Sequence, residues 1–335
     1  HTKAVHGEQQ GVVQALSGWH WIKRRERRAL LTMVFAILVT AIMAIVPGCE
    51  TLAGSTPIAT RLYLDPHMEA IAAAQEDPRF DPIAETPQAK WFTDWSTSAT
   101  ALRDIGRYLA GAAAADGVPV IVLYRIPQRD CGPNGASGGA PDTQEYRAWV
   151  DGVSAALKGH NEALVILEPD ALPGLPCEQG DRMGNLSYAV DALSTTSARV
   201  YIDAGHEKWL SAAEVANRLK RVGVDKVAGF SLNVANFYTT KGEVEFAESV
   251  RSELSKLGIT DSHYVIDISR NGAGPQDSSC NPPGARLGHA PQLFGGGTLD
   301  GLLWVKNPGQ TDGPCRGGPE HGFWAPAALS LLGLG

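Results

Sequence analysis

Short apolar runs alternate with amphipathic stretches along most of the chain beyond residue 62. The apolar runs are bounded by Gly, Pro or Asp and predict strands at residues 118–124, 164–167, 199–203, 227–232, 264–268 and 301–305. The stretches between them predict helices at residues 97–116, 143–159, 186–194, 211–222 and 243–257. Regular alternation of strand and helix is typical of a parallel sheet.

Local motifs refine this α/β interpretation. No GxGxxG or P-loop motif follows the first predicted strand, which favours a barrel over an open nucleotide-binding sheet. Ser211 and Glu214 have the spacing of a capping box at the start of one predicted helix. Residues 270–297 are rich in Gly, Pro and Asn, so we expect a long functional loop there rather than a linker.

The N-terminal part of the chain has the pattern of a targeting segment. Residues 29–46 carry no charge and follow the basic run 23–28, and their length nearly spans a bilayer. This predicts an export signal or a signal anchor with its basic end inside. The alternative is a buried core helix, which the flanking arginines disfavour. The residues before Cys49 weakly match a lipoprotein cleavage site. Lipid attachment at Cys49 is therefore an alternative to anchoring through residues 29–46.

Four segments follow from these patterns: a basic segment at 1–28, a signal or transmembrane segment at 29–48, a linker at 49–61 and a globular domain at 62–335. The 335-residue chain is 44% hydrophobic and has a net charge of −7. Residues 1–28 hold six Lys/Arg against two Glu, a local charge of +4, which leaves −11 on the remainder. That negative charge argues against nucleic acid as a partner of the folded part. We expect a secreted or extracellular protein, with membrane contact only through residues 29–48 or a lipid at Cys49.

Five cysteines are present, and Cys49 belongs to the targeting region. The other four allow three pairings in an exported domain. We favour Cys131–Cys177 and Cys280–Cys315, because each closes a local loop beside an acidic residue. A zinc site is the alternative, but no CxxC or HxxxH spacing supports it.

Four aspartates end apolar runs or lie beside cysteines: Asp130, Asp170, Asp203 and Asp312. A buried strand that ends in an acid delivers a carboxylate to the carboxyl edge of a parallel sheet, where α/β enzymes place their chemistry. Asp170 follows an apolar strand and a proline, so burial should raise its pKa, and a nearby Asp130 should raise it further. Several such acids on one edge indicate acid/base chemistry on a polar, uncharged substrate.

These acids lie within longer motifs that occur in a fixed order. The motifs are Tyr124-Arg-Ile-Pro-Gln-Arg-Asp130-Cys131, Tyr146-Arg-Ala-Trp149, Ile166-Leu-Glu-Pro-Asp170, Asp203-Ala-Gly-His206, Ile266-Asp-Ile-Ser-Arg270-Asn271-Gly-Ala-Gly and Trp304-Val-Lys306 leading to Asp312-Gly. Over residues 62–332 the chain resembles glycoside hydrolase family 6, the inverting cellobiohydrolases and endo-β-1,4-glucanases. The resemblance implies an α/β fold, a distorted, incomplete parallel β/α barrel of about seven strands, and the two disulfides favoured above.

The resemblance also implies roles for individual residues. Asp170 would be the general acid, Asp130 its partner and a water relay, and Asp312 a candidate base, while Tyr124 would lie near the cleaved sugar and Ser137 would help to hold the attacking water. The alternatives are a helix N-cap for Asp170 and a turn-forming Asp-Gly pair for Asp312.

Glucan binding needs flat apolar faces and planar donors. The expected substrate-binding residues are Trp91, Asp203, His206, Trp209, Asn233, Trp304, Lys306 and Gln310. For each Trp the alternative is core packing, and for His206 it is a structural hydrogen bond. The acid/base route needs no metal and no organic cofactor, and we expect a monomer whose partner is a β-1,4-glucan.

The chain departs from the family pattern at several positions. Ser279 stands where the family has Trp, Gln310 where it has Glu, Arg125 where Asn or Asp is commoner, and Arg286 is displaced by one residue. Short segments between the paired cysteines leave an open cleft, which predicts internal attack on the glucan. The alternatives are an exo-acting cellobiohydrolase, a glucan-binding protein with little turnover, and an unrelated structural lipoprotein.

Overall fold

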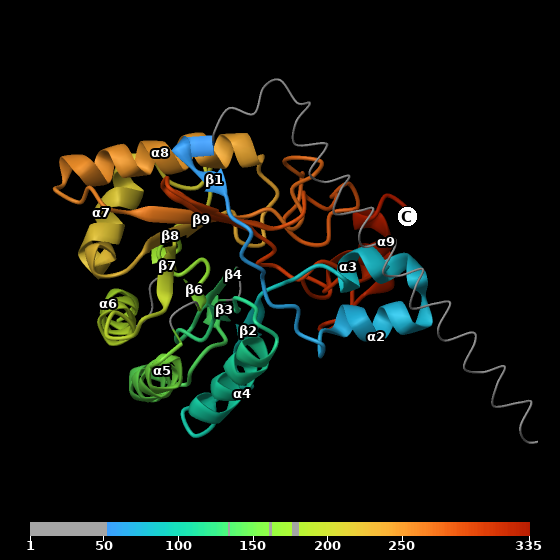
Figure 1. Cartoon of the computed structure of the whole chain (residues 1–335), viewed down its shortest axis with the longest axis horizontal. Helices are drawn as coiled ribbons and strands as arrows, with labels where there is room; N and C mark the ends of the chain where they lie inside the picture. The colour runs from blue at the N-terminus through green and yellow to red at the C-terminus, as the bar shows by residue number, and fades with distance from the viewer. Residues whose placement is uncertain (1–51, 133–134, 161–162, 176–180) are drawn as a thin grey trace, which may run out of the picture. The chain divides into compact units, whose positions relative to one another are not determined.

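Seven parallel strands form most of a nine-stranded sheet in the part of the chain that the computed structural model describes, residues 52–132, 135–160, 163–175 and 181–335 (Figure 1). In spatial order the parallel strands are β2 (Lys90–Phe92), β3 (Val120–Leu123), β6 (Leu164–Leu167), β7 (Arg199–Asp203), β8 (Gly229–Leu232), β9 (His263–Asp267) and β11 (Leu299–Leu303). Beyond β11, β10 (Gln292–Gly295) and β1 (Thr56–Pro57) pair antiparallel. The expected α/β barrel of about seven parallel strands is confirmed.

The barrel is incomplete between β2 and β11. No ladder joins these two strands among the described residues. Instead, the backbone N–H of Ala89 donates to the carbonyl of Trp304 at 2.9 Å. The indole N–H of Trp91 donates to the carbonyl of Val305 at 2.8 Å. The two ends of the parallel run are thus held together by a few hydrogen bonds at one edge.

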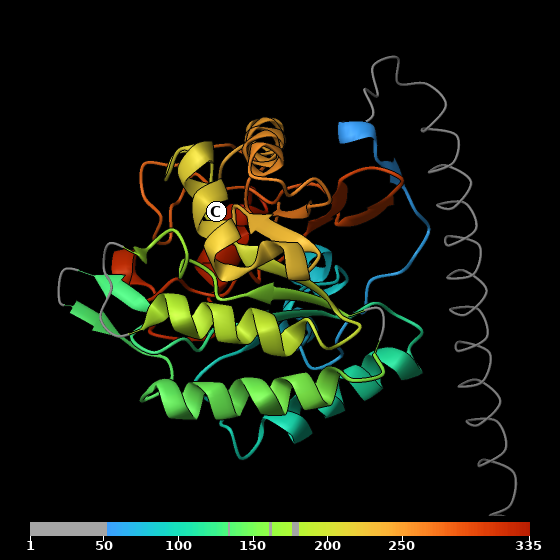
Figure 2. The same ribbon diagram turned by 90° about the vertical axis from the view of Figure 1, so that its left-hand side faces the viewer.

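Helices pack along the outside of the parallel strands. They are α4 (Ala101–Ala114), α5 (Thr143–Leu157), α6 (Arg182–Leu193), α7 (Ala212–Val222) and α8 (Thr240–Lys256), and each contacts the next (Figures 1 and 2). On β3, Ile121 and Leu123 pack among the residues of the outer core, whereas Val120 and Val122 belong to the separate inner core. Both faces of the strand are buried, which is why it reads as a continuous apolar run in the sequence.

A smaller cluster joins the first helices to the last. It is formed by α2 (Glu69–Glu76), the short 3₁₀ helix η2 (Pro78–Phe80), α3 (Asp81–Ala84) and α9 (Ala325–Leu331) (Figure 1). Its buried residues are Ala70, Phe80, Ile83, Ala84 and Ala328. The first and last helices of the described domain are therefore packed together, although they are more than two hundred residues apart in the chain.

The structure matches six predicted strands and five predicted helices to within a few residues. Ser211 caps α7 by accepting the N–H of Glu214 at 3.3 Å. Strand β2 was missed, because it has only three residues and one of them is Lys90. Residues 52–58, expected to belong to a linker, are hydrogen-bonded to the sheet edge, where the N–H of Ile58 donates to the carbonyl of Leu293 at 3.0 Å.

The predicted segments 1–28 and 29–48, together with Cys49, lie outside the described residues. No helix within the described ranges combines the length and apolar character needed to cross a bilayer.

Candidate active site

The carboxyl ends of the parallel strands bring the predicted acids to one edge of the barrel. Asp203 and Asp267 are the last residues of β7 and β9. Asp170 follows β6 by three residues, and Tyr124 follows β3 directly. Because parallel strands end on the same side, these side chains converge as the sequence predicts.

The turn after β6 holds Asp170 in an unusual backbone conformation. Glu168 and Asp170 have φ values of 49° and 67°. The fully buried Glu168 carboxyl accepts the N–H groups of Arg125 and Ile126 at 2.9 Å, which ties this turn to the end of β3. The N–H of Asp170 donates to Oδ2 of Asp203 at 2.8 Å. These contacts fix the direction of the Asp170 side chain.

Burial keeps the Asp170 carboxyl protonated to a higher pH than usual. Desolvation raises the pKa of Asp170 to about 6, the charge of Asp130 adds to this, and Arg182 opposes it. Desolvation, followed by the charge of Asp170, also raises the pKa of Asp203 well above its ordinary value. Asp170 thus stays protonated to a higher pH than an ordinary Asp, as a general acid requires.

Asp203 does not lie on the rim, where the sequence placed it. Its side chain is 1% exposed. It accepts the N–H of Asp170 and the hydroxyl of Ser231, the latter at 3.2 Å. Both contacts are internal to the protein, so Asp203 positions Asp170 and has no accessible surface for a sugar.

Asp130 is the more accessible member of the acidic pair. It begins the β4 (Asp130–Gly132) and β5 (Gly135–Ser137) hairpin, and its side chain is 47% exposed. Its Oδ1 accepts the Tyr124 hydroxyl at 2.8 Å, and Arg129 Nε lies 3.4 Å from its Oδ2. Ser137 pairs with Asp130 across the hairpin through the backbone, and its side chain lies outside the described structure.

Arg129 was not expected to belong to the site. Its guanidinium lies 4.6 Å from the centroid of the Tyr124 ring. Its Nη1 also binds Asp94 at 2.6 Å. Arg129 therefore orients both Tyr124 and Asp130, and its position directly before Asp130 in the sequence was the available signal.

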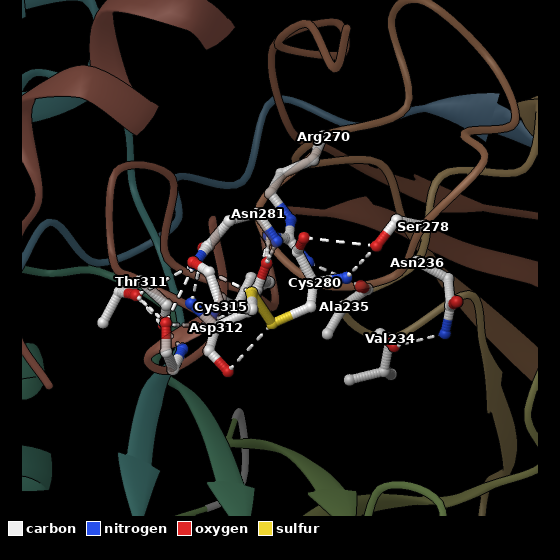
Figure 3. Close-up of polar contacts among 12 residues, drawn as sticks. Val234, Ala235, Asn236, Arg270, Ser278, Cys280, Asn281, Thr311, Asp312 and Cys315 are labelled. Carbon is white, nitrogen blue, oxygen red and sulfur yellow. Dashed lines mark hydrogen bonds and ion pairs between the residues drawn. A yellow bond between two sulfur atoms is a disulfide. The ribbon is translucent and has the colours of Figure 1, made fainter. Parts of the chain in front are cut away.

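Asp312 lies at the centre of a network of charges (Figure 3). Arg270 Nη1 lies 2.9 and 2.8 Å from its two carboxylate oxygens. Lys306 Nζ lies 3.2 Å from Oδ1, and the N–H of Asn281 donates to Oδ2 at 2.9 Å. The sequence predicted Asp312 and Lys306 here, whereas Arg270 was only part of a longer motif and Asn281 was missed.

Opposing effects set the ionisation of this network. Burial alone would raise the pKa of Asp312, but Arg270 and Lys306 outweigh it and lower that pKa below its ordinary value. Burial lowers the pKa of Lys306, and Asp312 opposes this change. Asp312 is therefore held as a carboxylate whose oxygens already accept hydrogen bonds, which makes it a weak base.

The disulfide between Cys280 and Cys315 is present, as predicted. It lies beside the Asp312 network, where the Asn281 side chain donates to the carbonyls of Gly313 and Cys315 (Figure 3). The pairing Cys131–Cys177 lies outside the described residues, because the placement of Cys177 and of the Cys131 side chain is not described.

Replacing both Cys280 and Cys315 with Ser should lower the free energy of unfolding by about 4 kcal/mol, because the bridge closes a loop between residues 35 apart. Denaturant unfolding of the variant and of the oxidised wild type measures this difference. A matching Cys280→Ala, Cys315→Ala pair controls for the replaced side chains. Equal unfolding midpoints for the wild type and both variants would refute the stabilising role.

Of the three tryptophans predicted to bind sugar rings, two are at least partly exposed and one is buried. Trp91 is partly exposed and meets the Tyr124 ring edge-on, with centroids 5.4 Å apart. Trp209 is 38% exposed and lies beside His206. Trp304, in contrast, is 4% exposed and donates its indole N–H to the carbonyl of His289 at 2.8 Å. The Trp304 prediction is corrected, since this ring packs in the core.

Asn233 is also a structural residue. It is fully buried, and its amide donates to the carbonyls of Tyr238 and Asp267 at 3.2 and 2.8 Å. Neither amide hydrogen remains for a sugar hydroxyl. The sequence could not indicate this, because the contact with Asp267 joins residues 34 positions apart.

Glycine shapes the turn that presents His206 and Trp209. Gly205 has a φ of 81°, and a Cβ there would lie 3.1 Å from the Trp209 ring and 3.2 Å from Pro173. The His206 ring stacks on Tyr238 with centroids 4.4 Å apart. Burial lowers the pKa of His206 to about 4, so its ring is neutral near neutral pH.

A cleft of about 780 Å³ is lined by Trp91, which contacts Tyr124, whereas Asp130 and Asp170 are not among the described residues that line it. Its lining includes Trp91, Trp95, Gln310 and Asp312. Trp95 is 52% exposed and was missed by the sequence analysis. Gln310 donates to Glu69 of α2 at 3.1 Å, so a carboxylate lies beside the position where the family pattern has one.

The described residues contain no group of His, Cys, Asp and Glu side chains arranged to hold a metal ion.

Comparisons with known proteins agree with this geometry. Residues 59–330 match the model of "Glycosyl hydrolases family 6". The chain is 43% identical over 270 residues to Endoglucanase A of Cellulomonas fimi, covering 78% of this chain and 58% of that protein. It is 37% identical over 303 residues to Endoglucanase A of Thermobispora bispora, covering 85% of this chain and 65% of that protein. The chain thus spans less than two thirds of the length of these two relatives.

A similar solved structure is the endoglucanase Cel6 from Mycobacterium tuberculosis, in complex with methyl-cellobiosyl-4-deoxy-4-thio-β-D-cellobioside. It has a TM-score of 0.75 and 41% sequence identity, and the match covers 82% of this chain and 96% of that chain.

Proposed function

This chain belongs to glycosyl hydrolase family 6, and on that basis we propose that it hydrolyses internal β-1,4-glucosidic bonds of a glucan with inversion at the anomeric carbon. The observation that carries the proposal is the buried Asp170 carboxyl, whose pKa is raised to about 6, beside the exposed carboxylate of Asp130. The similarity to named endoglucanases supports the internal mode of attack. The cello-oligosaccharide analogue bound to the Mycobacterium tuberculosis protein supports a β-1,4-glucan substrate.

In this proposal Asp170 donates its proton to the leaving glycosidic oxygen. An inverting reaction also needs a group that takes a proton from water on the opposite face of the sugar. Asp312 is a weak candidate, because Arg270, Lys306 and Asn281 already occupy its oxygens. We propose that a relay of water molecules carries the proton of the attacking water to Asp130.

The remaining side chains bind and orient the substrate. Tyr124 donates to Asp130 and lies between that acid and Trp91, so it would contact the sugar at the cleavage point. Ser137 pairs with Asp130 through the backbone of the hairpin, and we propose that its hydroxyl helps to hold the attacking water. Trp91, Trp209 and His206 offer flat faces to glucosyl rings. Asp312 and Gln310, which line the cleft, would bind hydroxyl groups there, and Lys306 would balance the charge of Asp312.

The disulfide supports an oxidising, extracellular location for the domain. Whether the chain is secreted or anchored depends on residues 29–48 and Cys49, and we propose export through that segment.

A pH profile should show the role of Asp170. Its acid form is required, so kcat/KM should fall as pH rises through about 6. The charge of Asp130 raises the pKa of Asp170, so Asp130→Asn should move this alkaline limb to lower pH in the residual activity. Asp191→Asn, a change at an exposed position of α6, should leave the limb in place. A limb that stays unchanged in Asp130→Asn would contradict the coupling of the two acids.

The proposed activity is tested with carboxymethylcellulose and barley mixed-linkage glucan. Internal cleavage predicts a rapid fall in viscosity before many reducing ends appear. Release of reducing ends with slow viscosity loss would instead indicate exo action. Binding to both glucans without any hydrolysis would reject the enzymatic proposal.

A further inference from the structure

A buried carboxyl that the proposed hydrolysis does not use lies in the first turn of α8. Glu243 is 0% exposed. Its Oε1 accepts the backbone N–H of Glu207 at 3.1 Å, whereas its Oε2 has no hydrogen-bond partner among the described residues. Glu207 belongs to the loop 205–209, which follows β7. Because this loop also carries His206 and Trp209, Glu243 ties α8 to two of the residues proposed to bind sugar rings.

The start of α8 meets the same loop at two further points. The ring of Tyr238, two residues before the helix, stacks on His206 with centroids 4.4 Å apart. The carboxylate of Glu207 lies against Gly242, where a Cβ would be 2.9 Å from both of its oxygens. Within the loop the N–H of Trp209 donates to the carbonyl of His206 at 3.0 Å. The positions of both rings therefore follow from a backbone that α8 holds.

The surroundings of Glu243 disfavour its charged form. Desolvation by burial raises the pKa of Glu243 to about 8; the N–H of Glu207 and the charge of Lys208 oppose this, and the charge of Glu207 adds to it. On α8 itself, Lys241 and Glu245 are exposed and pair with each other. Glu243 is thus a neutral acid near neutral pH, with a like charge on the loop that covers it.

We propose that Glu243 is a positioning residue for glucan binding, which holds the loop 205–209 so that the rings of His206 and Trp209 are ready to stack on glucosyl units. The inference rests on the proposed function, because it assigns glucosyl units to these rings. An ionised Glu243 would need water at Oε2, and water reaches that atom only if the loop moves away. The loop should therefore loosen, and glucan affinity should fall, as the pH rises through about 8.

Hydrogen exchange, measured by mass spectrometry at pH 6.5, tests the positioning without any glucan. Glu243→Ala removes the acceptor, so the backbone of residues 205–209 should exchange about fivefold faster than in the wild type. Glu243→Gln keeps an acceptor oxygen and should exchange like the wild type. Glu245→Gln, at an exposed position of the same helix, is the control. Equal exchange in Glu243→Ala and the wild type would overturn the proposal.

Calorimetry with cellotetraose tests the consequence for binding. The Asp170→Asn background is used throughout, because it prevents cleavage and removes the titration of Asp170. At pH 6.5, Glu243→Ala should weaken binding about fivefold and Glu243→Gln should leave it unchanged. Between pH 6.5 and 9, the protein that retains Glu243 should lose about threefold more affinity than its Glu243→Gln counterpart. Parallel pH profiles of these two proteins would overturn the proposal even if Glu243→Ala does not fold.

The two measurements separate this proposal from the proposed function. Faster exchange in Glu243→Ala with unchanged affinity for cellotetraose would show that the loop is held by Glu243 but binds no sugar, which would refute the inference. Absence of cellotetraose binding in every sample would refute the proposed substrate and, with it, the role of the loop in binding. The exchange result for Glu243 would stand in that case.

Discussion

Replacing Asp170 with Asn should lower kcat for glucan hydrolysis by about 10³-fold, while the affinity for a cello-oligosaccharide stays nearly unchanged. The amide has the shape of the carboxyl but cannot donate the required proton at this pH. Asn tolerates the φ of 67° found at this position, and the backbone N–H still donates to Asp203. Kinetics on barley glucan and calorimetry with cellotetraose measure the two quantities.

A substrate with a good leaving group separates acid catalysis from a structural defect. Dinitrophenolate needs little protonation, so the Asp170→Asn variant should lose much less activity on a dinitrophenyl cello-oligosaccharide than on glucan. Asp191→Asn, at an exposed position of α6, should behave like the wild type on both substrates. Equal losses on both substrates in Asp170→Asn would show that Asp170 is not the general acid.

Replacing Asp312 with Asn should reduce the free energy of unfolding by about 3–5 kcal/mol, because it leaves two buried cations without their carboxylate. The side chains of Arg270 and Lys306 are 5% and 14% exposed. Activity should fall with stability, since Asp312 itself lines the cleft. Denaturant unfolding of the variant and the wild type at neutral pH gives the difference.

The pH dependence of this difference follows from the lowered pKa of Asp312. A carboxyl whose pKa is lower in the folded state contributes stability above its unfolded value of about 3.9, and that contribution is lost as the pH falls through the folded value. The two proteins should therefore differ by a constant amount near neutral pH and converge in acid. Asp261→Asn, whose side chain is 98% exposed, serves as the control. A difference that grows in acid would contradict the assigned charges.

The sequence predicted those parts of the fold in which local pattern and burial coincide. Strand β6 was predicted with its observed bounds, because all four of its residues are apolar and buried. Strand β2 was not predicted, because it is short and begins with the charged residue Lys90. In the structure Lys90 forms an ion pair with Asp65 at 3.4 Å. The sequence therefore defined the parallel sheet better than the closing edge of the barrel.

Two properties of the site could not be predicted from the sequence: how deeply each side chain is buried, and which residues far apart in the chain are in contact. Asp130 was expected to lie near Asp170 and to raise its pKa, and the raised pKa of Asp170 agrees with this. Trp304 and Asn233 were placed at the surface, although sequence alone does not report how deeply a side chain lies. The contact between Arg270 and Asp312 spans 42 residues, and no local spacing could reveal it.

The proposed reaction is tested most directly by proton NMR of the sugar released in the first minutes of hydrolysis. Inversion at a β-1,4 bond requires that the new reducing end appear first as the α-anomer and convert to the β-anomer only by mutarotation. We expect this order for the wild type and no product on the same timescale for Asp170→Asn. Initial formation of the β-anomer would contradict the inverting mechanism built on Asp170 and Asp130.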